Sequence, residues 1–239
     1  MAQVIFDAIL DTPYDGLNNK IRNRVLMLFR QMLTHFIDPL VIYTLDGSRI
    51  MLPLSHDLPF IRKKFPYYSS NVARIAKHIA RKYNALSFVD IGANVGDTVA
   101  ILRNLAHFPI LCVEGNAYFS DILQKNLAHF TDVFLETSFV SDQENTIRGE
   151  FDSQGGTAHF IENCSTNKKI FVKTLSSILE KHSTFKNFKM IKIDTDGYDC
   201  RILSSELTLI SRLRPVIFFE YDPYYFEALW YFVWSPPHI

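Results

Sequence analysis

Short apolar runs alternate with helix-type patterns along the second half of the chain. Helical periodicity marks residues 69–83, the segment that begins at Asp97, and residues 120–130. Five apolar runs between these segments have the length of buried strands, at residues 88–91, 110–113, 133–135, 190–193 and 216–219. This alternation predicts an α/β domain in which helices cover both faces of a parallel sheet.

The first 68 residues predict an extension before this domain. Apolar residues at helical spacing predict an amphipathic helix after Pro13, formed by Leu17, Ile21, Val25, Leu28 and Met32. We expect it to pack across the side or mouth of the main domain, with a partner helix as the alternative. Apolar runs around Asp46-Gly47 predict a β-hairpin over residues 40–54, and three prolines predict a loop after it. The predicted units are residues 1–68 and 69–239.

The stretch from Phe88 to Asp97 carries the first chemical signal. It begins as a strand, passes through a turn that contains Gly92 and Gly96, and opens a helix at Asp97. A dinucleotide fingerprint needs glycine where this chain has Asn94 and Asp97. A carboxylate at the helix start repels a pyrophosphate and suits a cationic ligand. S-adenosylmethionine, with its sulfonium and ammonium groups, is such a ligand.

Acidic residues recur where the predicted strands end. They are Asp90, Glu114, Asp194 and Glu220. Ligands of open parallel sheets bind at the carboxyl ends of the strands, so we expect these residues to form one site. A carboxylate at the position of Glu114 can accept hydrogen bonds from ribose hydroxyls, in a nicotinamide site as well as in an S-adenosylmethionine site.

Composition narrows the classes of partner. Lysine and arginine number 25 and so do aspartate and glutamate, which predicts neither a nucleic-acid nor a membrane partner. The three cysteines form no disulfide or zinc pattern, and no apolar run reaches the roughly 20 residues of a membrane span. An export signal is not recognised at the N-terminus, so we expect a cytoplasmic protein.

Several motifs together resemble the FkbM family of S-adenosylmethionine-dependent methyltransferases. The resemblance covers residues 50–223 and rests on Asp90-Ile-Gly-Ala-Asn-Val-Gly-Asp97, Val113-Glu-Gly-Asn116, Thr174-Leu175, Ile191-Lys-Ile-Asp-Thr-Asp-Gly197 and Phe219-Glu220. It implies a class I methyltransferase fold, which is Rossmann-like. It also implies O-methylation of a hydroxyl on a sugar, a polyketide or a similar small molecule.

The resemblance assigns the cofactor-binding residues one by one. The residues assigned to the turn and to the methionine part of the donor are Asp90, Gly92, Ala93, Asn94, Gly96 and Asp97. Glu114 falls on the ribose with Asn116 beside it, and the adenine falls on Val140, Ser141 and Asp142. Asp194 closes the pocket. Aspartates at positions 196 and 199 stand where the family has glutamates, and Ser176 stands where it has an aspartate.

Methyl transfer to an alcohol needs an acceptor oxygen in line with the methyl group and a destination for its proton. Asp194 is the first candidate for the general base, ahead of His159 and of His56, either of which can equally be an ordinary histidine. A magnesium ion at Asp194, Asp196 and Asp199 is conceivable. A strand end followed by a helix start explains these carboxylates better, so we expect no metal.

The short length of the tail after Glu220 predicts an incomplete sheet. Two further strands and a helix need on the order of 30 to 40 residues, and 19 follow Glu220. We therefore expect the C-terminal strands to be missing and the strand at residues 216–219 to be an edge, covered by the hairpin, by a partner or by a second copy. The alternatives to an active methyltransferase are a donor-binding pseudoenzyme and, less favoured, an NAD-dependent oxidoreductase.

Overall fold

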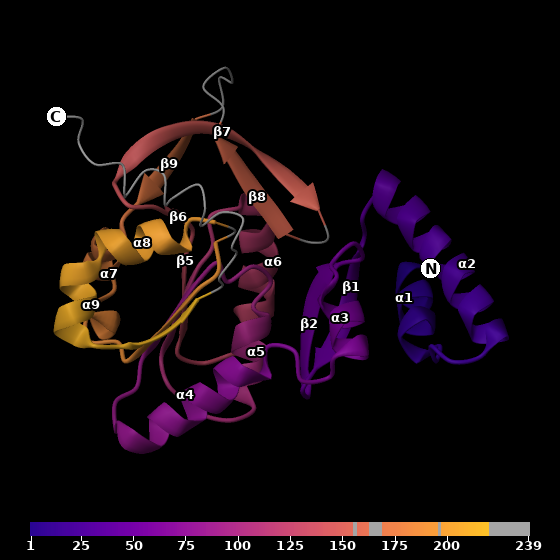
Figure 1. Cartoon of the computed structure of the whole chain (residues 1–239), viewed down its shortest axis with the longest axis horizontal. Coiled ribbons are helices and arrows are strands. Elements are labelled where there is room, and N and C mark those ends of the chain that lie inside the picture. Colours follow the sequence, from indigo (N-terminus) through magenta and orange to yellow (C-terminus); the bar gives the residue numbers. More distant parts are fainter. Residues whose placement is uncertain (155–156, 163–168, 196, 220–239) are drawn as a thin grey trace, which may run out of the picture.

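The computed structural model describes residues 1–154, 157–162, 169–195 and 197–219, with the backbone alone at 151–154 and 157–162 (Figure 1). The expectations for Asp196, Glu220 and the tail lie outside the described residues. The same holds for the side chain of His159, although its backbone belongs to a strand.

The core of the molecule is a five-stranded parallel sheet in the order β11-β10-β3-β4-β5. Its strands are β3 (Phe88–Ile91), β4 (Ile110–Val113), β5 (Val133–Glu136), β10 (Met190–Ile193) and β11 (Val216–Phe219). All five predicted strands are confirmed. The order of the strands reverses between β3 and β10, which places a ligand crevice at their carboxyl ends.

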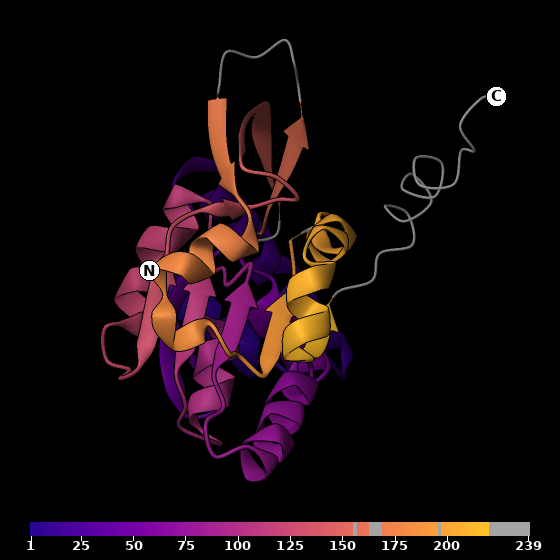
Figure 2. The ribbon, with the colours of Figure 1, turned by 90° about the vertical axis from the view of Figure 1, so that its left-hand side faces the viewer.

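Helices cover both faces of this sheet, as predicted (Figures 1 and 2). One face packs on α4 (Ser70–Lys82), α5 (Asp97–Arg103) and α6 (Ala117–Leu127). The other face packs on α7 (Leu175–Lys181), α8 (Asp199–Ser205) and α9 (Leu207–Leu213). Because β3, β4 and β10 are buried on both faces, their residues are apolar almost throughout.

A second sheet lies beyond the carboxyl ends of β4 and β5 (Figure 1). Its order is β6-β9-β7-β8, with β6 (Phe139–Val140), β7 (Asn145–Gln154), β8 (Thr157–Glu162) and β9 (Lys169–Lys173). All four of these strands are inserted along the chain between β5 and β10.

The N-terminal region contains more helix than predicted. The expected helix is α2 (Leu17–Phe36), and the expected hairpin is β1 (Leu40–Leu45) with β2 (Ser48–Pro53). Two further helices are present, α1 (Ala2–Asp11) and α3 (Leu58–Lys64). The loop expected after the hairpin is wrong at α3, because Pro59 occupies the first turn of that helix, where its missing N–H is no loss.

The hairpin packs on α5 and α6 through apolar side chains, and one polar side chain of α6 fastens it. The Asn126 side chain accepts a hydrogen bond from the Met51 N–H at 2.8 Å and donates to the Met51 carbonyl at 2.7 Å. It also donates to the carbonyl of Val95 at 2.8 Å. In the described part of the chain β1 and β2 pair only with each other, so the hairpin does not cover β11.

The orientation of α2 differs from the expected one. Its buried residue is Arg30, which donates to the carbonyls of Leu54 at 2.8 Å and Ser55 at 2.5 Å and pairs with Asp57 at 2.9 Å. The apolar stripe lies on the other side of the helix and is exposed. The expectation that this stripe packs on the main domain is therefore wrong.

No described helix combines the length and the apolar character that crossing a bilayer requires. Cys112 and Cys200, the cysteines whose positions are described, are free thiols.

Candidate functional site

The turn after β3 lies against the end of β10, at the point where the strand order reverses. Gly92 has φ of +78°, and a Cβ atom there would overlap the backbone carbonyl of Asp194. The Gly92 N–H donates to the carbonyl of Val113 at 3.0 Å, and the Asp194 N–H donates to that of Ile91 at 3.0 Å. Only glycine allows this close approach of the two strand ends.

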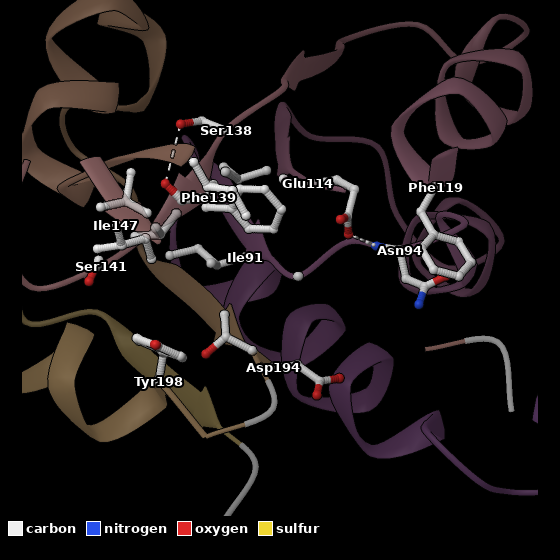
Figure 3. Close-up of a pocket in the computed structure, with 17 residues that line it drawn as sticks. Ile91, Asn94, Glu114, Phe119, Ser138, Phe139, Ser141, Ile147, Asp194 and Tyr198 are labelled. Atoms are coloured by element: carbon white, nitrogen blue, oxygen red, sulfur yellow. Dashed lines mark hydrogen bonds between the residues drawn. The ribbon is translucent and has the colours of Figure 1, made fainter. Parts of the chain in front are cut away.

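Glu114, which directly follows β4, is held by the backbone. Its Oε2 accepts from the N–H of Asn94 at 2.8 Å (Figure 3). Its Oε1 accepts from the N–H of Asn116 at 2.7 Å. Burial raises the pKa of Glu114, and the two N–H donors oppose that rise. The carboxylate oxygens keep further lone pairs, so this anchored group can still accept hydrogen bonds from a ligand.

A pocket opens between these groups and α8. In Figure 3, Glu114 and Ser138 lie on one side of it, with Asp194 and Tyr198 on the other. The residues around it come from the turn, from the strand ends of the main sheet and from the second sheet: Ile91, Gly92, Asn94, Val113, Glu114, Gly115, Phe119, Ser138, Phe139, Val140, Ser141, Ile147, Ile170, Val172, Asp194, Thr195 and Tyr198. Polar groups converge on a largely apolar wall, which is typical of a cofactor pocket.

The apolar wall depends on a second close approach. A Cβ atom on Gly115 would overlap the ring of Phe139, so the ring rests directly on the backbone after Glu114. The second sheet continues this wall with Val140, Ile147 and Val172. A flat aromatic ligand group can lie against such a surface.

A buried charged cluster lies on the β3–β10 side of the pocket. The Nζ of Lys192 is 3.3 Å from Oδ1 of Asp90, its neighbour in the strand register, and 3.0 Å from Oδ2 of Asp194. Burial alone lowers the pKa of Lys192, but the carboxylates of Asp90, Asp194 and Asp97 outweigh it and raise that pKa. Burial raises the pKa of Asp90 to about 6, against the effect of Lys192. It also raises the pKa of Asp97, the first residue of α5.

His56 reaches the same turn from the N-terminal region. Its Nδ1 accepts a hydrogen bond from the Leu58 N–H at 3.2 Å, which leaves the ring proton of the neutral form on Nε2. Burial lowers the pKa of His56 to about 4, although the nearby Asn94 side chain opposes the shift. The ring is therefore neutral at pH 7 and is a poor proton carrier in that buried position.

Six of the residues predicted to bind a cofactor line the pocket: Gly92, Asn94, Glu114, Val140, Ser141 and Asp194. The other six predicted residues do not line the pocket. Asp90 is fully buried beneath the turn, and Asp142 accepts from the Ser141 hydroxyl at 2.9 Å. Asn116 caps α6 by accepting from the Tyr118 N–H at 2.9 Å, so its side chain faces the helix start. Ala93, Gly96 and Asp97 shape the turn and the beginning of α5.

Asp199, one of the three carboxylates weighed as metal ligands, has a partner within the protein. Its Oδ2 accepts from the hydroxyl of Thr195 at 2.9 Å. Across the described residues, histidine, cysteine and acidic side chains gather nowhere in a group of three suited to a metal ion.

Sequence reasoning missed Phe139, Tyr198 and the role of Lys192. A lysine inside an apolar strand, two positions before a strand-end aspartate, was the available signal for Lys192. Phe139 gave no signal, because its contact with Gly115 joins two segments through tertiary structure.

The model of the family described as the methyltransferase FkbM domain matches residues 90–235, which is more than half of the chain. The chain belongs to the FkbM methyltransferase family. The matched region begins at Asp90 and contains the turn, Glu114, the second sheet and the Lys192 cluster. The parallel strand order reported above is that of the class I methyltransferase fold, so the predicted fold class is confirmed.

Among solved structures, the chain resembles the Pyrococcus abyssi tRNA (uracil-54, C5)-methyltransferase in complex with S-adenosyl-L-homocysteine. The identity is 13% and the TM-score is 0.39, over 75% of this FkbM-family chain and 34% of that one. The chain thus spans about a third of the length of that structure. No curated protein matches the chain.

Proposed function

We propose that this FkbM-family chain is an S-adenosylmethionine-dependent methyltransferase that methylates a hydroxyl group of a small molecule such as a sugar or a polyketide. The observation that carries the proposal is the distribution of charge around the pocket. The ammonium group of Lys192 lies 3.3 Å from the carboxylate of Asp90 and 3.0 Å from that of Asp194, and the carboxylate of Asp97 adds to the negative charge that acts on it. This excess of negative charge suits a ligand with a sulfonium and an ammonium group.

The residues around the pocket fit the parts of this donor. Glu114, fixed by two backbone N–H groups, is suited to accept from the ribose hydroxyls. The wall that contains Phe139 and Val140 suits the adenine. The Asp194 side of the pocket suits the methionine end, and Asp97 at the start of α5 disfavours the pyrophosphate of a nicotinamide cofactor.

The bound donor supplies an electrophilic methyl group. The protein has to hold the acceptor oxygen in line with that group and keep water away from it. Asp194 is the proposed base, because its carboxylate is 39% exposed and lines the pocket while Lys192 fixes its orientation at 3.0 Å. It would accept the proton of the acceptor hydroxyl when the methyl group passes from the sulfonium sulfur to that oxygen, which would leave the donor as a neutral thioether.

Calorimetric titration with S-adenosylmethionine tests the donor site, with NAD as a parallel titrant. We expect micromolar binding of the methyl donor, about −8 kcal/mol, and none of NAD. Glu114→Gln should weaken donor binding at least tenfold, because a ligand hydroxyl loses a charged acceptor. Glu180→Gln, on the exposed surface of α7, is the matched control and should bind as the unchanged protein does.

Turnover separates an enzyme from a donor-binding pseudoenzyme. Transfer of a labelled methyl group to a panel of sugar and polyketide hydroxyls should give a methyl ether, and Asp194→Asn should reduce the rate about 100-fold or more. Donor binding without transfer to any hydroxyl in the panel would support the pseudoenzyme. Tight NAD binding would instead contradict the whole proposal.

A further inference from the structure

The helix α2 turns its apolar side to the solvent. The exposed apolar residues follow each other at spacings of three or four, with exposed fractions from 45% at Val25 to 78% at Phe36. We call them the α2 stripe: Leu17, Ile21, Val25, Leu28, Phe29, Met32 and Phe36. The helix lies at the periphery of the molecule, where α1 separates part of it from the hairpin (Figure 1).

The opposite side of α2 is fixed in place, so the exposed stripe is no accident of a loose helix. Arg30 reaches three acceptors in the segment after β2 and lies over the ring of Phe60 at 4.3 Å. Asn23, on the same side as Arg30, donates to the carbonyl of Pro13 at 3.0 Å. These polar contacts require that the stripe face outward.

Charge indicates what the α2 stripe meets. Residues 17–36 contain four lysine and arginine side chains and no acidic one. Arg30 is buried, and the other three flank the stripe: on a helical wheel, Lys20 and Arg24 fall on one border and Arg22 on the other. An apolar face with basic borders is typical of helices that lie in the interface of an anionic bilayer.

We propose that α2 docks the protein on an anionic phospholipid surface, with the α2 stripe among the acyl chains and Lys20, Arg22 and Arg24 at the headgroups. The axis of the helix lies in the plane of the surface, since no described helix is suited to cross a bilayer. Its 20 residues span about 30 Å, long enough for both ends of the stripe to reach the lipid at once.

A second copy of the chain is the rival occupant of this stripe. Two copies of α2 would bring together six basic border residues and no acidic side chain of either helix. An anionic surface satisfies those charges, so it is the better partner. The neutral charge of the whole chain conceals this local excess, which is why composition predicted no membrane partner.

Flotation of the full chain with lipid vesicles tests the proposal without any methyl donor. Vesicles of equimolar phosphatidylcholine and phosphatidylserine should carry the protein, and pure phosphatidylcholine vesicles should carry at least tenfold less. The binding should weaken as salt is raised. Absence of binding to the anionic vesicles would overturn the proposal.

Two variants identify the surface that binds. The triple change K20Q, R22Q and R24Q should reduce binding to anionic vesicles at least tenfold, and so should L28E with M32E. The matched control is R74Q, K77Q and R81Q on α4, which removes the same charge from a helix whose apolar side is buried. Equal losses in the control would overturn the proposal.

Light scattering in the absence of lipid examines the rival occupant. We expect a monomer, and the same mass for L28E with M32E. A dimer of the unchanged protein that L28E with M32E dissociates would assign the α2 stripe to a second copy and overturn the lipid proposal. All substituted residues are exposed, so the variants should keep the fold, which circular dichroism checks.

Discussion

The two sides of the pocket are built by different means. On the Glu114 side, backbone N–H groups from two loops fix one carboxylate. On the Lys192 side, charged side chains contact one another inside the sheet, and backbone hydrogen bonds also hold the Asp97 carboxylate. The first arrangement depends on turn geometry and the second on charge balance, so the two sides should respond differently to substitution.

The largest effect is expected where the charge balance is broken. Lys192→Met leaves Asp90 and Asp97 buried without their cation, which should lower the free energy of unfolding by about 3–5 kcal/mol. Chemical denaturation measures it. Lys186→Met at an exposed position is the control, within about 0.5 kcal/mol of the unchanged protein. Adding Asp90→Asn to Lys192→Met should recover part of the loss, and failure to do so would contradict the pairing.

The pH dependence of stability should also distinguish the Lys192 side. Because the pKa of Asp90 is raised from 3.8 to about 6, the native state holds that proton more tightly than the unfolded chain does. The contribution of Asp90 to stability therefore falls as pH rises from about 4 to about 6. Asp90→Asn should gain about 3 kcal/mol relative to the unchanged protein over that range.

The test compares the stability of Asp90→Asn with that of the unchanged protein at each pH. The slope of either stability curve alone is not used. His56 has its pKa lowered to about 4, so its contribution has the opposite sign: it is present above pH 6.5 and is lost as pH falls through 4. His56 is common to both proteins, and its effect cancels in their difference. Parallel stability curves would show that Asp90 does not titrate as described. Urea titrations at several pH values provide the data.

The turn itself should be sensitive to a single methyl group. Gly92→Ala combines an unfavourable positive φ with an overlap on the Asp194 carbonyl, and we expect a loss of about 2–3 kcal/mol. Gly47→Ala is a matched control, because Gly47 has φ of +91° and its nearest neighbour is 3.8 Å from the added Cβ. That variant should lose about 1 kcal/mol. Equal losses in thermal or urea unfolding would mean that the overlap is relieved easily.

The smallest change in stability is expected on the Glu114 side. Glu114→Gln keeps one acceptor oxygen and loses the other, so one backbone N–H loses its bond and stability falls by about 1 kcal/mol. Urea unfolding measures that loss, and donor titration of the same sample should show at least a tenfold loss of affinity. If Glu114→Gln lost 3 kcal/mol or more, as Lys192→Met is expected to, the two sides of the pocket would not differ in their response to substitution.

The sequence predicted the parts of the fold that depend on local pattern. The five strands, the hairpin at Asp46-Gly47 and the turn at Gly92 follow from periodicity and glycine positions. The helix α3 was missed because prolines predict an interruption, yet one proline fits the first turn of a helix. A stripe of apolar residues also reveals that α2 is amphipathic without revealing which side the protein covers.

The candidate site was also predictable only where it depends on local pattern. Glu114 and the turn residues could be placed because strand ends meet at one edge of a sheet. Lys192 could not be assigned, since its partner Asp90 is its neighbour only in the register of two strands that are about a hundred positions apart along the chain. The charge balance around Lys192 depends on the assembled sheet, whereas the geometry of a turn depends on consecutive residues.

The side chain of Asn126 has a consequence for how the chain folds. It binds the backbone of Met51, 75 positions earlier, and so fastens the hairpin to α6. During synthesis the hairpin emerges well before the amide that fastens it, and a two-stranded ribbon alone is only marginally stable in water. We expect the N-terminal elements to acquire their final contacts late, after α6 has joined the growing nucleus.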